Sequence, residues 1–158
     1  MKISIKYGFC LLFPAFFFAG CNDNFQSSIP NYPVSLSLNL TTTYPTFNNS
    51  TNQILTFTKP IVIGEAIGYG GILVYSAPYT DDYGNSVYYA FDMSCPYEAK
   101  NNIRVYLQES SLGKVVCEKC GSVFDISFGT GLPESGPTKE PLKKYKTILS
   151  RDILYITR

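Results

Sequence analysis

Short apolar runs separated by turn-forming residues dominate the chain from residue 34 onward. In residues 34–40, Val and Leu alternate strictly with Ser and Asn, so their apolar side chains share one face of a strand. Further β-rich runs follow at shorter spacing. The strands that the sequence predicts cover residues 34–40, 54–58, 61–63, 72–76, 87–92, 103–107, 114–117, 123–126, 145–149 and 153–157.

No stretch between residues 34 and 158 keeps a helical period of apolar positions for three turns. The segment Asp-Asp-Tyr-Gly-Asn at residues 81–85 lies between two apolar runs and predicts a hairpin turn. The expected fold class is therefore all-β, built from many short antiparallel strands in one domain.

The N-terminus has the layout of a secretory signal, with Lys2 and Lys6 ahead of an apolar stretch over residues 7–19. That stretch is shorter than the roughly 20 residues that a spanning helix needs. It ends in Phe-Ala-Gly-Cys, which looks like a bacterial lipobox with Cys21 as the lipid-bearing residue. An ordinary signal followed by a coincidental cysteine is the alternative.

The resulting division is a lipoprotein signal peptide at residues 1–20, a lipidated N-terminus and polar tether at 21–33, and a β domain at 34–158. Lipid on Cys21 would hold the protein to a membrane of the bacterial cell envelope, with the domain outside the cytoplasm. Without the signal the net charge is near −1, from 11 basic and 12 acidic residues, and no sizeable basic run remains. Nucleic acid is therefore not expected as a partner.

Three cysteines remain once Cys10 leaves with the signal and Cys21 carries lipid, namely Cys95, Cys117 and Cys120. An odd number in an oxidising compartment leaves one thiol over in any disulfide scheme, which favours a ligand role. Cys-x-x-Cys-Gly is a knuckle in which two sulfurs converge. The pattern suits zinc, an iron–sulfur cluster or a redox disulfide.

The order of short motifs over residues 71–158 resembles the Rieske iron–sulfur domain. The matching segments are a strand pair leading into Cys95-Pro96, then Cys117-x-x-Cys120-Gly-Ser-x-Phe-Asp, a Gly-rich turn at 129–131, Ser-Gly-Pro at 135–137, Pro-Leu at 141–142 and a final hairpin. The resemblance implies an antiparallel sandwich with a small metal-loop subdomain.

In that family two cysteines hold one iron and two histidines hold the other. Cys95 and Cys117 match the cysteine ligands, whereas Tyr97 and Cys120 stand at the histidine positions of a chain that has no histidine. Ser122 matches a serine that donates a hydrogen bond toward the cluster. The cysteines that form a loop disulfide in high-potential members are replaced by lysines, at positions 100 and 119. The resemblance therefore implies an atypical centre rather than a Rieske centre proper.

Three occupants of the site stay open. One is a [2Fe–2S] cluster on Cys95, Cys117 and Cys120, with Tyr97, Glu98 or solvent as the fourth ligand. The second is a zinc ion on the same three thiolates, and the third is no cofactor, with two of the thiols paired as a disulfide.

The primary functional expectation is single-electron transfer to a redox protein partner, through the atypical cluster. The alternative is an envelope module without a cluster, or with zinc, in a structural or interaction role. No nucleophile stands beside an identifiable base, so the sequence favours an electron carrier or a non-enzymatic module over a catalyst.

Overall fold

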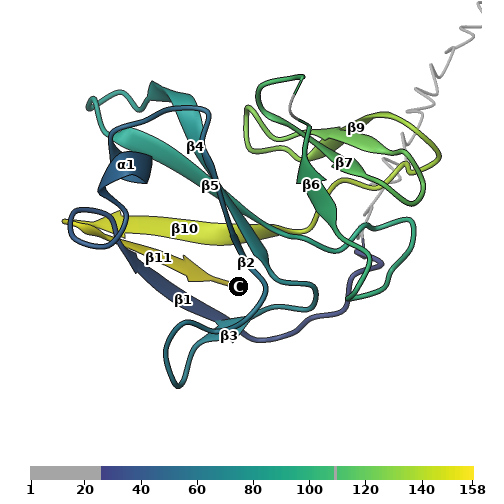
Figure 1. Ribbon diagram of the computed structural model, residues 1–158, viewed down its shortest axis with the longest axis horizontal. Helices are drawn as coiled ribbons and strands as arrows, with labels where there is room; N and C mark the ends of the chain where they lie inside the picture. Colours follow the sequence, from purple (N-terminus) through teal and green to yellow (C-terminus); the bar gives the residue numbers. More distant parts are fainter. Residues whose placement is uncertain (1–25, 109) are drawn as a thin grey trace, which may run out of the picture.

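A computed structural model describes residues 26–108 and 110–158, so the signal and Cys21 lie outside the described residues. These residues form eleven strands in two antiparallel sheets and one short helix (Figure 1), which confirms the predicted all-β class. No helix among them is long or apolar enough to cross a membrane.

The larger sheet has seven strands in the order β2-β4-β5-β10-β11-β1-β3. Their bounds are β1 Val34–Asn39, β2 Ile54–Phe57, β3 Ala66–Ile67, β4 Ile72–Thr80, β5 Ser86–Asp92, β10 Lys144–Ser150 and β11 Ile153–Thr157. The sheet curls, so that Leu36 and Leu38 of β1 share a buried core with Phe57 of β2 and Val74 of β4. Its two halves therefore face each other across this first core, as in the predicted sandwich.

The smaller sheet has four strands in the order β6-β7-β8-β9 and forms the predicted small subdomain. Its strands are β6 Val105–Leu107, β7 Lys114–Cys117, β8 Val123–Asp125 and β9 Leu132–Ser135. A second buried core lies between this sheet and the larger one, and it includes Cys95, Cys117 and Phe124. The cysteine loops are thus part of the subdomain's packing.

Strand β4 separates the two cores. Ile72 and Val74 belong to the first core, while Leu73 and Tyr75 belong to the second, and all four are fully buried. Because successive side chains of a strand point to opposite faces, a strand that is apolar on both faces must be covered on both. β4 is therefore a wall common to both halves.

The predicted hairpin joins β4 to β5. Asp81 N–H donates to Asn85 O at 2.9 Å, and the Asp81 carboxylate accepts the N–H groups of Tyr83 and Asn85. Gly84 adopts φ +81°, which its lack of a side chain permits. The predicted turn is confirmed.

The predicted strand at residues 61–63 was wrong. Ile61, Val62 and Ile63 lie in an exposed loop between β2 and β3, bounded by Pro60 and Gly64. Three elements escaped prediction, the four-residue helix α1 Pro45–Asn48 and the short strands β3 and β9. α1 is a single turn that packs Phe47 into the first core, so tertiary contact rather than a helical period holds it.

The segment before β1 is docked on the domain from Ser27 onward, although its composition predicted a polar tether that would not pack. Ile29 is only 1% exposed. The Glu140 carboxylate accepts the hydroxyls of Ser27 and Ser28 at 2.9 and 2.5 Å. Lys143 Nζ donates to the carbonyls of Ile29 and Pro30, at 2.8 and 2.9 Å. The packed domain therefore begins near residue 27 rather than at 34.

Candidate metal centre

Cys95 follows β5 in a short loop that closes on itself. Its N–H donates to Ile103 O at 3.0 Å, and its carbonyl accepts the N–H of Ala99 at 2.9 Å. Ala99 adopts a left-handed conformation with φ +49°. The Cys95 side chain is fully buried and points into the second core. The loop thus holds this thiol in a fixed, dry position.

Cys117 and Cys120 belong to the predicted knuckle at the end of β7. Gly121 N–H donates to Cys117 O at 2.8 Å, and Cys117 N–H donates to Ser122 O at 2.9 Å. Gly121 has φ +72°, which its lack of a side chain permits. These two bonds bend the loop back so that both sulfurs face the first cysteine loop.

The three sulfurs that the sequence grouped together do meet in the structure. Cys95, Cys117 and Cys120 have Sγ atoms that all lie within 4.8 Å of one another. Cys95 Sγ and Cys120 Sγ, from different loops, are 3.6 Å apart. All three are free thiols, with Cys95 and Cys117 buried and Cys120 half-buried. Two loops therefore present three soft donors to one point.

The surroundings shift the pKa values of two of these thiols in opposite directions. Burial raises the pKa of Cys95 to about 12, although backbone hydrogen bonds from Glu98 and Tyr97 to its sulfur oppose that rise. Partial burial alone would raise the pKa of Cys120 as well. Hydrogen bonds from the side chain and backbone of Ser122 outweigh it and bring the pKa below its ordinary value. Of these two thiols, Cys120 therefore ionises more readily.

Ser122 is fully buried beside Cys120. Its Oγ lies 3.2 Å from Cys120 Sγ and accepts the N–H of Thr138 at 3.4 Å. Because the Thr138 bond uses an oxygen lone pair, the hydroxyl proton stays free to donate to a thiolate at Cys120. A Cβ on Gly136 would come within 2.4 Å of Ser122 Cα, so glycine there keeps this contact close.

The side chains that were candidates for a fourth ligand, Tyr97 and Glu98, belong to the first cysteine loop. The Tyr97 side chain is 58% exposed, and its service as a ligand stays a prediction. The Glu98 carboxylate is bound to Lys119 Nζ at 2.8 Å, and this ion pair joins the first cysteine loop to the second. Lys119 stands where the resemblance implied a disulfide cysteine, so an electrostatic bridge now connects the same two loops.

Sequence reasoning missed Asp92, a buried residue whose hydrogen bonds hold the chain segment leading into Cys95. Its carboxylate accepts the N–H groups of Tyr69, Gly70 and Ser94 and the hydroxyl of Tyr145, at 2.9, 3.1, 2.8 and 2.6 Å. Burial, and then the charge and hydrogen bond of Asp92, raise the pKa of Tyr145. A lone Asp at the end of a strand gives no sequence signal for such a role.

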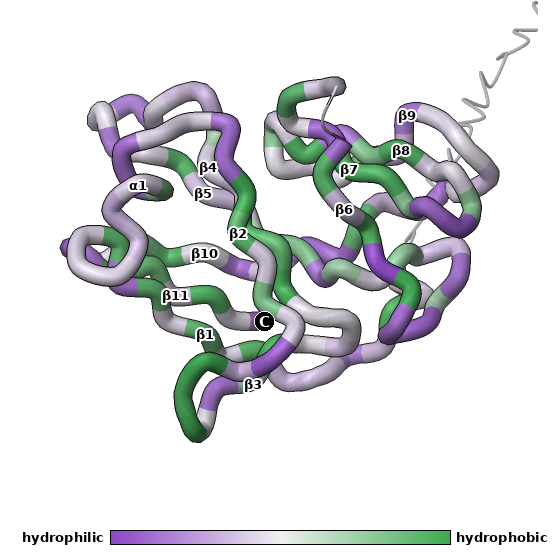
Figure 2. The backbone as a smooth tube through the Cα atoms, in the orientation of Figure 1, coloured by the Kyte–Doolittle hydropathy of each residue, from purple (hydrophilic) through white to green (hydrophobic). Residues whose placement is uncertain are grey.

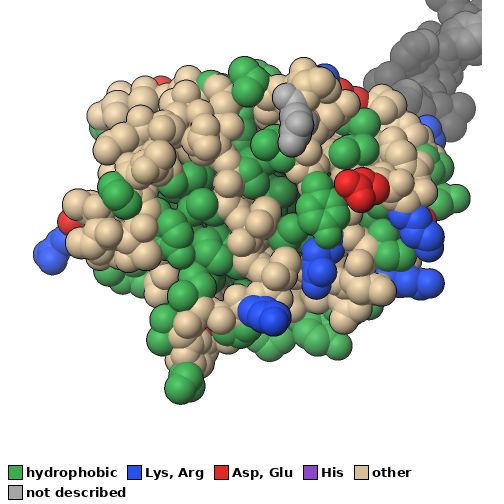
Figure 3. All heavy atoms as spheres, in the orientation of Figure 1, with side chains coloured by type: hydrophobic (Ala, Val, Ile, Leu, Met, Phe, Trp, Pro, Cys, Tyr) green, Lys and Arg blue, Asp and Glu red, His purple; other side chains and the backbone are tan. Residues whose placement is uncertain are grey.

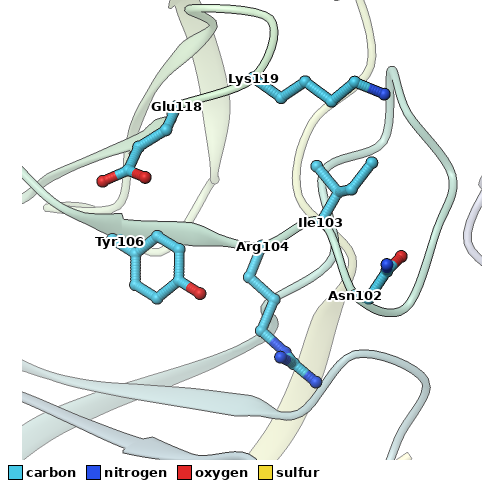
Figure 4. A pocket seen from close by; sticks show the side chains of 6 residues that line it. All are labelled: Asn102, Ile103, Arg104, Tyr106, Glu118 and Lys119. Atoms are coloured by element: carbon cyan, nitrogen blue, oxygen red, sulfur yellow. The ribbon is translucent and has the colours of Figure 1, made fainter.

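A shallow groove of about 220 Å³ borders the second cysteine loop (Figure 4). It is lined by Asn102, Ile103, Arg104, Tyr106, Glu118 and Lys119. Glu118 and Lys119 lie between Cys117 and Cys120 in the chain, so a molecule in this groove would touch the loop that carries both sulfurs.

The geometry of the donor set distinguishes between the expected metal groups. Three thiolates bound to one tetrahedral zinc at about 2.3 Å lie roughly 3.8 Å from each other. The 3.6 Å between Cys95 and Cys120 fits that arrangement. The Rieske resemblance instead assigns Cys95 and Cys120 to different irons, which bridging sulfides hold apart, so their sulfurs would stand wider. The Cys95–Cys120 distance therefore fits two ligands of one tetrahedral metal, zinc or iron, and is shorter than the resemblance implies for sulfurs on different irons.

The chain matches no family model and no curated protein. Among solved structures three chains match. One comes from the complex of reduced oxygenase and oxidized ferredoxin in carbazole 1,9a-dioxygenase. It is 18% identical, covers 68% of this chain and 90% of its own length, and has a TM-score of 0.44. Because this likeness is distant, we base the proposals below on the chain's own residues.

Proposed function

We propose that this protein is a lipid-anchored metal-binding module of the bacterial cell envelope, with a Rieske-like domain whose metal is held by Cys95, Cys117 and Cys120. The observation that carries the proposal is the convergence of three free thiols, from two loops, within 4.8 Å of one another. The envelope location rests on the signal pattern at residues 1–20 and on Cys21.

The form that the sulfur distances favour is a single thiophilic ion such as Zn²⁺. Zinc accepts three thiolates with an oxygen or nitrogen as the fourth ligand. Cys120 is half-buried, so solvent could reach the site and supply the fourth ligand, with Tyr97 as the alternative. Bound zinc has no redox chemistry, and its role would be to clamp the two cysteine loops together.

Single-electron transfer through a [2Fe–2S] cluster is the second candidate, with a redox protein as partner. The ordered match over residues 71–158 favours it. The polar groups aimed at the sulfurs favour it too, since hydrogen bonds to sulfur tune the potential of iron–sulfur clusters. They are the backbone N–H groups of Tyr97 and Glu98 on Cys95, and the Ser122 hydroxyl beside Cys120. With the ligand assignment that the Rieske resemblance implies, this form requires Cys120 to move away from Cys95.

Metal analysis of the fragment that starts after Cys21, purified without oxygen, separates these forms. One zinc per chain in colourless protein supports the single-ion site. Iron with acid-labile sulfide and visible absorption supports the electron carrier. Metal-free protein, with three reactive thiols or a disulfide among them, contradicts metal binding altogether.

Two variants test whether the metal that is measured is bound at the three cysteines. Cys120→Ser should lower the metal content strongly, because it removes one of three thiolates. Glu118→Ala, an exposed change in the same loop, should leave the metal content unchanged. Equal metal content in wild type and Cys120→Ser would show that the metal is bound elsewhere.

A further inference from the structure

The loop between β2 and β3 presents three consecutive large apolar side chains to solvent. Ile61, Val62 and Ile63 are 50%, 61% and 104% exposed. We call these three residues the apolar tip. Figure 2 shows it as a green end of the backbone next to β3, and in Figure 3 it projects from the lower edge of the molecule. Single exposed apolar residues are ordinary, whereas a contiguous exposed group marks a binding surface.

Hydrogen bonds hold the apolar tip in one shape. Ile61 N–H and Val62 N–H donate to Glu65 Oε2 at 2.9 and 3.0 Å, and Glu65 N–H donates back to Val62 O at 3.2 Å. Glu65 is the only acidic residue between Phe57 and β3, so the loop's one negative charge is turned toward its own backbone. Lys59, on the N-terminal side, is exposed and cationic. The loop thus offers apolar side chains beside a positive charge.

The apolar tip lies near the path of the docked N-terminal segment. β3 directly follows the tip and pairs with β1 through Val34 and Ile67, and Gly68 N–H donates to Pro33 O. Residues 27–33 run from Glu140 and Lys143 along the lower edge of the molecule to this point (Figure 1).

The docked segment also shortens the link to the membrane. Only residues 22–26 separate Cys21 from docked Ser27, so the lipid attachment lies within about 20 Å of Ser27 even if that link is fully extended. A bilayer that holds Cys21 is therefore close to this edge of the domain.

We propose that the apolar tip inserts into the bilayer that holds the lipid on Cys21, so that the protein touches its membrane at two places. The proposal rests on the lipid anchor of the proposed function. Apolar side chains enter the boundary between headgroups and acyl chains, while Lys59 reaches the phosphate groups. The docked segment starts at Ser27, within about 20 Å of the lipid attachment, and ends beside the loop that carries the tip, so one bilayer can contact both. Two contacts fix the orientation of the domain, which a single point of attachment leaves free.

The absence of tryptophan from the chain permits a direct test with single-Trp variants of the full, lipidated protein. Val62→Trp is placed in vesicles of phosphatidylethanolamine and phosphatidylglycerol, with and without brominated acyl chains. Leu112→Trp is the matched control, because Leu112 is 73% exposed in the β6–β7 loop at the opposite edge in Figure 1. We expect blue-shifted emission and severalfold stronger quenching for Val62→Trp than for the control.

Three outcomes would overturn the proposal. Equal quenching of the two variants, or water-like emission from Val62→Trp, would place the tip outside the bilayer. A blue shift that grows with protein concentration without vesicles would assign the tip to a second copy of this chain. A blue shift only when other envelope proteins are added would assign it to a protein partner.

Separate measurements test the lipid anchor and the metal site. Mass spectrometry of the N-terminal peptide reports the lipid on Cys21, and its absence would remove the anchor and this proposal together. Metal content is expected to be the same in Val62→Trp and wild type, so a failed metal site leaves the vesicle result intact.

Discussion

Replacing the buried carboxylate of Asp92 with an amide should destabilise the domain. It should also loosen the chain segment that leads from β5 to Cys95. In Asp92→Asn the side chain keeps its shape, but one oxygen becomes an NH₂ group facing donors. The Oδ1 side receives the N–H groups of Gly70 and Ser94, and the Oδ2 side receives those of Tyr69 and Gly70 with the Tyr145 hydroxyl. Only the hydroxyl can turn round to accept, so at least one backbone N–H is left unpaired.

The cost follows from the bonds lost. A hydrogen bond to a charged group contributes about 1.5–3 kcal/mol, and an unpaired buried donor costs about 1–3 kcal/mol. These two figures describe the same loss and are not added, so the expected decrease in the free energy of unfolding is about 2–3 kcal/mol. For a domain of this size that is a fall of roughly 10 °C in the melting temperature.

Urea unfolding followed by circular dichroism measures the change, and Asp82→Asn is the control. Asp82 is an exposed carboxylate in the hairpin turn, so its amide variant should stay within about 0.5 kcal/mol of wild type. The reasoning fails if Asp92→Asn and Asp82→Asn unfold at the same urea concentration. A lower metal affinity in Asp92→Asn would follow from the loss of the bond to Ser94, next to Cys95.

Three further predictions concern the loops and the pH dependence. Lys119→Glu sets two carboxylates against each other across the cysteine loops and should weaken metal binding, measured by chelator competition, whereas exposed Lys100→Glu should not. Gly136→Ala brings a Cβ onto backbone atoms at positive φ and should lower the free energy of unfolding by about 2–4 kcal/mol, measured in urea. Gly121→Ala also has positive φ but open space around it, so it should lower that free energy by about 1 kcal/mol. Equal costs would contradict the contact between Gly136 and Ser122. The pKa of Tyr145 is raised in the folded state, so the stability it contributes is complete below pH 10 and is lost as the pH rises above 10; urea titrations across this range should show a smaller loss in Tyr145→Phe than in wild type.

The elements that depend on local sequence patterns were predicted correctly. Strict alternation in residues 34–40 specified β1, and the Asp-Asp-Tyr-Gly-Asn turn at 81–85 specified the β4–β5 hairpin, because each depends on neighbours in the chain. The three cysteines were predicted to meet, and they do. A run of β-branched residues without alternation, at 61–63, carried no information on which face would be buried.

Long-range contacts account for what the sequence did not reveal. Ile29 is buried because Glu140 and Lys143, more than a hundred residues later, hold the segment around it. Asp92 acts through three backbone N–H groups, which leave no trace in residue identity. The distance between Cys95 and Cys120, on which the choice of metal depends, is likewise set by the packing of two loops.

Strand β4 has one face in each core, and this arrangement affects how the protein unfolds. Neither half can lose its packing without uncovering side chains of the other, so the two sheets should behave as one cooperative unit in unfolding. Small metal domains with little core of their own often collapse when the ion leaves. Here the cysteine loops share a core with β4, whose other face belongs to the first core. The site could therefore change a ligand, or exchange one metal for another, while the fold stays intact.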